Sequence, residues 1–150
     1  MWGRWTTVAL LSMTPALIFG QSAAAAAGIK WQLDPYALVA VMAVCGTIEG
    51  LFVAWLGGPT TRIGLVQRII TWMRKPRALA MADRWGPWGG MTLGVAVVGQ
   101  EPILLALRWL GVDLKRLVVP IVLSNILFAF LWYWFIKLGW DQVLKAGLDL

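Results

Sequence analysis

Two long stretches of this chain carry almost no charge, and this feature limits the folds that it can adopt. Residues 36–57 are apolar except for Thr47 and Glu49, and residues 117–136 are uncharged, with a polar centre at Ser124 and Asn125. A helix rises about 1.5 Å per residue, so roughly 20 apolar residues cross the hydrocarbon core of a bilayer. The two stretches therefore predict an all-α integral membrane protein.

The composition supports this prediction. The chain is 60% hydrophobic and 13% charged, whereas a soluble domain is about 25% charged. Its 150 residues suit one domain. The chain is rich in tryptophan, with 11 residues, and indole rings are enriched at membrane–water boundaries.

We predict a single membrane domain over residues 1–150, with about four hydrophobic segments and an amphipathic interfacial helix. The predicted parts are an N-terminal helix or signal-anchor at 1–29, a span at 36–57, a basic cytoplasmic segment at 60–84, a broken or re-entrant span at 85–110 and a span at 117–139. The first part also has the charged start, apolar middle and small-residue end of a cleaved signal peptide. We favour a retained helix, because residues 5–29 are uncharged and long enough to span.

The basic segment is predicted to face the cytoplasm and anionic lipid. It holds six of the chain's 13 Lys and Arg residues between two apolar stretches, which is the pattern of a bacterial inner-membrane protein. Apolar residues recur there at helical spacing among the basic ones, so we expect a helix along the membrane surface. No nucleic-acid partner is expected. The predicted headgroup contacts are Arg62, Arg68, Arg74, Lys75 and Arg77.

The third segment is predicted to break in its middle. Pro102 disfavours helix at the preceding residue, so we expect the break around Gln100 and Glu101. If the segment spans the membrane, the basic residues at 108, 115 and 116 fall on the outer side, against the positive-inside rule. A re-entrant segment keeps them inside. Both versions stay open, and we favour the re-entrant one because it also explains the broken helix.

Glu49 and Glu101 are the candidate site residues with the clearest physical argument. An ionised carboxylate in hydrocarbon costs at least about 2.5 kcal/mol, so each one needs a proton, a partner or a wet cavity. Glu49 follows Gly46 and Glu101 follows Gly99, a weak internal echo of the kind seen in inverted-repeat transporters. We predict that one or both bind a proton or a cationic substrate, with Arg108 as a possible partner for Glu49.

A structural interpretation of the same residues stays open. Glu101 before Pro102 is typical of a helix start, where an acid lies near the positive end of the helix dipole. Glu49 before Gly50 is open to the same interpretation. Asn125 is a tentative binding residue, but together with Ser124 it is better explained as an interhelical hydrogen-bonding group.

The residue inventory argues against metal and enzyme chemistry. The chain has no His and a single Cys, Cys45, so the usual ligands for zinc, haem or copper are missing from the sequence. No nucleophile with a nearby base is evident. We expect no cofactor and no catalytic activity.

Several short motifs lie between residues 33 and 135. They are Leu33-Asp34-Pro35 before a span carrying Gly46, Arg84-Trp85-Gly86, Leu110-Gly111 followed by Asp113-Leu114-Lys115-Arg116, and a final span with Trp132. Together they resemble the small multidrug export family of bacterial membrane proteins, which is similar to the DedA (VTT-domain) group. A basic residue, an aromatic and a glycine open that family's second repeat, and Arg84, Trp85 and Gly86 match them. The resemblance implies transport of small molecules or lipids.

Two functions therefore compete. The first is a small transporter of small molecules or lipids that acts as a homo-oligomer, since four short segments hardly enclose a pathway alone. The second is an accessory subunit of a larger membrane complex, respiratory or photosynthetic, in which the tryptophan-rich helices contact other membrane subunits.

Overall fold

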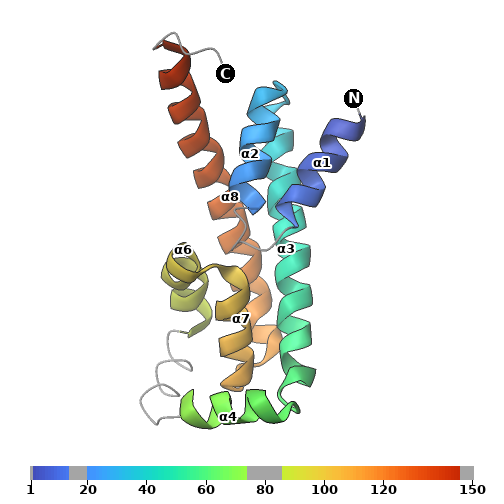
Figure 1. Cartoon of the computed structure of the whole chain (residues 1–150), viewed down its shortest axis with the longest axis vertical. Helices are drawn as coiled ribbons and strands as arrows, with labels where there is room; N and C mark the ends of the chain where they lie inside the picture. Colours follow the sequence, from blue (N-terminus) through green and yellow to red (C-terminus); the bar gives the residue numbers. More distant parts are fainter. Residues whose placement is uncertain (1, 14–19, 74–85, 146–150) are drawn as a thin grey trace. The chain divides into compact units, whose positions relative to one another are not determined.

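The computed structural model describes residues 2–13, 20–73 and 86–145, and every regular element in these ranges is a helix (Figure 1). The elements are α1 (Trp2–Ser12), α2 (Gly20–Lys30), α3 (Pro35–Thr60), α4 (Gly64–Met73), the π-helix η2 (Gly86–Gly94), α6 (Val95–Val98), α7 (Gln100–Trp109) and α8 (Leu114–Lys145). The prediction of an all-α fold is confirmed for these residues. The chain forms two compact units: Met1–Gly46 with Asn125–Leu150 (unit 1) and Thr47–Ser124 (unit 2).

Two helices, α3 and α8, are long and apolar enough to cross a membrane. They correspond to the predicted spans at 36–57 and 117–139, and each extends a few residues further. Asp34 and Pro35 begin α3: the Asp34 carboxylate accepts a hydrogen bond of 2.8 Å from the backbone N–H of Ala37, and proline fits the first helical position. Asp113 stands in the same place before α8.

The apolar faces of α3 and α8 are largely exposed. Only 33% of the most apolar part of α3 and 39% of that of α8 are buried within the protein. A helix from the core of a water-soluble protein is mostly buried, so these two helices differ from that case. Their exposed large side chains include Val44, Ile48, Phe52 and Trp55 on α3, and Val119, Leu123, Ile126, Phe130, Trp134, Phe135 and Leu138 on α8.

Unit 1 begins with two short helices where the sequence predicts one. α1 ends at Ser12 and α2 begins at Gly20, while residues 14–19 lie outside the described part. In one straight helix, Val8 and Ala24 would be about 24 Å apart. Here α1 and α2 pack against each other, and both residues belong to one buried cluster. The described residues of the predicted N-terminal helix at 1–29 therefore form α1 and α2.

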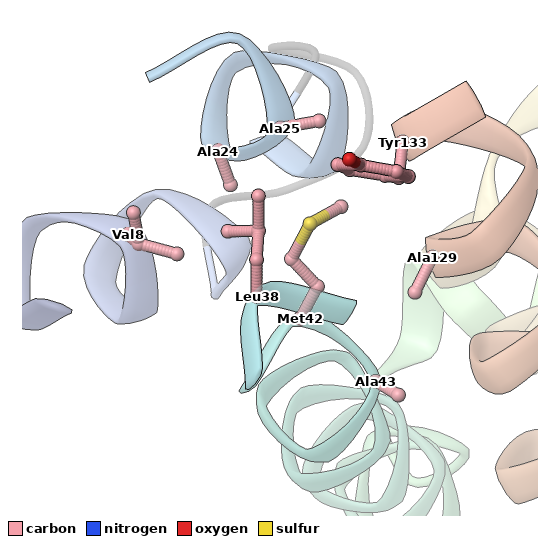
Figure 2. Packing of buried hydrophobic residues seen from close by; sticks show 8 residues of the cluster. All are labelled: Val8, Ala24, Ala25, Leu38, Met42, Ala43, Ala129 and Tyr133. Atoms are coloured by element: carbon pink, nitrogen blue, oxygen red, sulfur yellow. The ribbon is translucent and has the colours of Figure 1, made fainter. Parts of the chain in front are cut away.

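The core of unit 1 joins these helices to parts of α3 and α8. Figure 2 shows Leu38 and Met42 of α3 reaching between the small residues of α2 and the ring of Tyr133 on α8. Small residues permit this close packing, because a side chain on Gly28 would overlap with Leu38. The buried members are Val8, Ala24, Ala25, Leu38, Met42, Ala43, Ala129 and Tyr133.

In unit 2, the third apolar segment folds back on itself as a helical hairpin (Figure 1). η2 and α6 form its first arm and α7 forms its second. Between them lies Gly99 at φ 97° and ψ 164°, a conformation that residues with a side chain rarely adopt. The break thus lies one residue before the predicted position, because glycine tolerates the turn and Pro102 fits inside the first turn of α7, where no intrahelical N–H bond is lost.

Part of the predicted basic segment is helical and forms α4. It follows α3 after a short turn and runs crosswise to the adjoining end of α3 (Figure 1). Ile70 is buried, whereas Ile63 before the helix and Leu65 on it are exposed. The rest of the predicted basic segment, residues 74–84, lies outside the described residues.

Candidate functional site

The two predicted carboxylates meet in unit 2. Glu49 lies near the middle of α3 and is partly buried. Glu101 lies in the first turn of α7, directly after the turn of the hairpin. Their side chains are hydrogen-bonded to each other, and the Oε2 atom of Glu101 is buried. The fold therefore brings together two residues that are 52 positions apart in the sequence.

This hydrogen bond has a chemical requirement. An ionised carboxylate has no hydrogen to donate, so two carboxyl groups can hydrogen-bond directly only when at least one is protonated. Two ionised carboxylates at this separation would instead repel each other. A direct hydrogen bond between the Glu49 and Glu101 carboxyl groups is thus possible only when one of them carries a proton.

The hairpin positions Glu101 through close packing of its two arms. A side chain at Gly90 or Gly94 of η2 would press against Ile103 of α7, with calculated Cβ contacts of 3.1 Å and 2.9 Å. Small residues let helices approach in this way. Gly99, where the hairpin bends, lies about one helical turn before Ile103. The packing of the two arms therefore helps to set the direction of the first turn of α7.

Arg108 has a different role from the one predicted. The Arg108 guanidinium donates hydrogen bonds from Nε to the carbonyl oxygen of Ala54 (3.0 Å) and from Nη1 to that of Val112 (2.7 Å). Gly57 and Gly58 leave room for its side chain against α3. The expected ion pair with Glu49 is not formed, because these carbonyl oxygens take the guanidinium and Glu49 pairs with Glu101.

The neighbouring Trp109 strengthens the same attachment. Its indole Nε1 donates a hydrogen bond of 3.1 Å to the hydroxyl of Thr60, the last residue of α3. The chain then leaves α7 through Gly111 at φ 95°, which lets Val112 N–H bond back to the Leu107 carbonyl. The C-terminal end of α7 is therefore held against the end of α3.

Asn125 belongs to unit 1. It is 1% exposed, and its Oδ1 accepts a hydrogen bond of 3.0 Å from Nε2 of Gln21 on α2. A side chain on Gly46 of α3 would overlap with this Asn125 amide. Ser124 bonds within its own helix, to the carbonyl of Ile121. These contacts favour the interhelical interpretation of Asn125 over a ligand-binding role.

The structure describes two of the five residues that are predicted to contact lipid headgroups. Arg62 and Arg68 are exposed, before and on α4. Arg74, Lys75 and Arg77 lie outside the described residues.

Sequence reasoning missed two buried or partly buried amides. Gln100 is 6% exposed, beside Gly50 of α3, and Gln21 is the partner of Asn125. A signal was present for both, because each is an uncharged polar residue inside an otherwise apolar stretch. The internal echo does not extend to conformation: α3 is continuous through Gly46, whereas Gly99 interrupts its segment.

Comparison with protein-family models, with curated proteins and with solved structures found no match.

Proposed function

We propose that this chain is a multi-pass protein of the bacterial inner membrane that transports a small molecule or a lipid, and that the Glu49–Glu101 pair is its proton or cation site. The observation that carries the proposal is the direct hydrogen bond between the two carboxyl groups. The carboxyl pair forms only when it holds a proton, and a cationic substrate can replace that proton. Such a pair can therefore couple proton movement to substrate movement.

The exposure of α3 and α8 supports the membrane setting. Their outward apolar side chains, such as Phe52 and Phe135, make a surface that water would not tolerate over this length. A bilayer supplies the apolar surroundings that these helices lack within the protein. Exposed basic residues on and next to α4, Arg62 and Arg68, then lie at the level of the lipid headgroups.

The fold-back of the hairpin supports a re-entrant third segment. The contacts of Arg108 with Ala54 and of Trp109 with Thr60 hold the end of α7 beside the end of α3. Lys115 and Arg116 at the start of α8 then share a membrane side with Arg62. This version gathers the basic residues on the cytoplasmic side, as the positive-inside rule requires.

Depth supports the coupling role. Glu49 lies 11 residues before the end of α3, which is about 16 Å along a helix. This is about half the thickness of a 30 Å hydrocarbon core. A carboxyl pair near mid-depth can be reached from either side after a modest rearrangement, which is the usual location of transporter sites. Homo-oligomers would supply the remaining walls of a pathway.

The substrate class in this proposal, small molecules or lipids, comes from the resemblance to the small multidrug export and DedA groups. The alternative is an accessory subunit of a larger membrane complex. The aromatic side chains of Phe130, Trp134 and Phe135 on α8 are exposed. They favour the accessory-subunit function if protein, and not lipid, covers them.

Vesicle assays test the proposal. The purified chain is reconstituted in vesicles with an internal pH dye, and proton movement is followed on adding ethidium, tetraphenylphosphonium or a fluorescent phospholipid. We expect probe movement coupled to protons in the wild type and in Asp141→Asn, a matched change at an exposed carboxylate. Glu49→Gln and Glu101→Gln should insert normally and lose coupling. Unchanged coupling in both variants would overturn the proposal, and co-purification with unrelated subunits would favour the alternative.

A further inference from the structure

Gln100 of α7 lies beside Gly50 of α3, next to the carboxyl pair. Gln100 is 6% exposed, and a Cβ placed on Gly50 would overlap with its amide nitrogen, lie 3.1 Å from its amide carbon and lie 3.0 Å from Cγ2 of Ile121. Gly50 thus leaves the space that the amide group and Ile121 occupy. In the sequence, Gly50 directly follows Glu49 and Gln100 directly precedes Glu101.

This contact completes the attachment of α7. At its C-terminal end, α7 is tied to α3 by Arg108 and Trp109. Gln100 lies eight residues before Arg108, about 12 Å along the helix, so the first turn is positioned by nearer contacts, which are the packing of Ile103 on η2 and of Gln100 beside Gly50. The carboxyl groups need correct distance and direction to hydrogen-bond, and a swing of 1 Å is enough to disturb such a bond.

The chemistry of the side chain points the same way. A leucine or methionine would fill this volume in a buried interface, and burying an amide is unfavourable unless it is hydrogen-bonded. An amide is neutral at every pH at which the carboxyl pair changes its protonation, so it holds the segments together without competing for the proton.

We propose that Gln100 is a positioning residue for the Glu49–Glu101 pair, and that Gly50 is the position that admits its amide. The inference rests on the proposed function only in treating the pair as the functional site. The positioning role itself does not depend on transport. Displacing the amide should weaken the binding of the proton between the two carboxyl groups.

Infrared difference spectroscopy on the full chain in vesicles measures that proton directly. With ¹³C-labelled glutamate, the wild type should show a protonated carboxyl band that is lost on raising the pH, and Glu49→Gln and Glu101→Gln should each abolish the band of the pair. Gln100→Ala, the similarly sized Gln100→Leu, and Gly50→Ala should each lower the proton affinity roughly tenfold, a shift of about one pH unit in the midpoint.

Gly64→Ala is the matched control. Gly64 is the first residue of α4, and a Cβ there would meet nothing within 4 Å. The band and its midpoint should stay as in the wild type. The double variant Gly50→Ala with Gln100→Ala separates causes: if the methyl group acts by displacing the amide, the double variant should match Gln100→Ala alone, and full additivity of the two effects would contradict the inference.

The outcomes separate the two proposals. A wild-type midpoint in Gln100→Ala, Gln100→Leu and Gly50→Ala overturns the positioning role, whether or not the protein transports anything. Shifted midpoints together with full proton coupling in Glu49→Gln and Glu101→Gln uphold the positioning role and overturn the proposed function. A carboxyl band that survives either glutamine variant unchanged overturns the inference, because no shared proton then exists.

Discussion

The Nε atom of Arg108 donates a hydrogen bond of 3.0 Å to the carbonyl oxygen of Ala54, so a side chain of α7 binds the backbone of α3. A second bond, from Nη1 to Val112, closes the turn that leads to α8. One guanidinium therefore joins α3, the last turn of α7 and the turn that leads to α8.

Replacing Arg108 by methionine should destabilise the protein. The change keeps most of the apolar stem but removes both hydrogen bonds, and bonds to charged groups contribute about 1.5–3 kcal/mol each at most. We expect a loss of about 2–3 kcal/mol in the free energy of unfolding, measured in mixed detergent micelles. Lys115→Met, at an exposed position, is the control. Equal stability of the two variants would show that the Arg108 hydrogen bonds do not stabilise the protein.

A smaller effect is expected at Trp109. Trp109→Phe and Thr60→Val each remove the same indole–hydroxyl hydrogen bond of 3.1 Å. Each should cost about 0.5–1.5 kcal/mol, and the double variant should cost less than the two single effects added, because both changes remove one interaction. Strict additivity would show that the bond contributes nothing to stability.

The helical prediction succeeded where local sequence determines structure. Uninterrupted apolar runs predicted α3 and α8 to within a few residues, because the length of an apolar run is a local property of the sequence. The sequence pattern did not predict the packing of α1 on α2, since this packing depends on contacts that the local pattern does not contain.

The candidate site was predicted in its members but not in its contacts. Glu49 and Glu101 were singled out by the unfavourable energy of an acid in apolar surroundings. Their mutual hydrogen bond depends on how the hairpin folds back, and the sequence favoured Arg108 as the partner because opposite charges attract. The Gln100–Gly50 contact was missed for the same reason.

Gly99 should resist substitution. Its φ of 97° and ψ of 164° lie in a region that is nearly restricted to glycine. Gly99→Ala should therefore cost about 1–3 kcal/mol of stability, whereas Gly64→Ala should be neutral or slightly stabilising. Thermal unfolding in detergent, followed by tryptophan fluorescence, compares the two. A stable Gly99→Ala variant would show that the hairpin turn can take another form.

The interhelical amide pair of unit 1 gives a graded prediction. Asn125→Leu leaves Gln21 without its partner inside the protein, whereas Gln21 is itself only partly buried. Interhelical hydrogen bonds in membranes contribute about 0.6 kcal/mol on average and up to about 1.7 kcal/mol. We expect Gln21→Leu, which takes this bond from the buried Asn125 amide, to cost at least as much as Asn125→Leu in unfolding experiments, and the reverse order would contradict the burial seen here.

Topology can be tested with single cysteines. In a Cys45→Ser background, Arg62→Cys and Lys115→Cys should react with an impermeant maleimide from the same side of the membrane, because the proposed hairpin returns to the side from which it starts. Asp141→Cys, 26 residues into α8 from Lys115, should react from the opposite side. Labelling of residues 62 and 115 from opposite sides would require a fully spanning third segment.

The fold-back of α7 on η2 also bears on how such a chain is assembled. From Gly86 to Leu107, Glu101 is the only charged side chain in the sequence. In the proposed re-entrant topology, a hairpin of this composition, bent at Gly99, enters the bilayer from one face without carrying any arginine or lysine across. Its insertion then depends mainly on protonating one acid, and the hydrogen bond to Glu49 on the neighbouring helix requires that same proton.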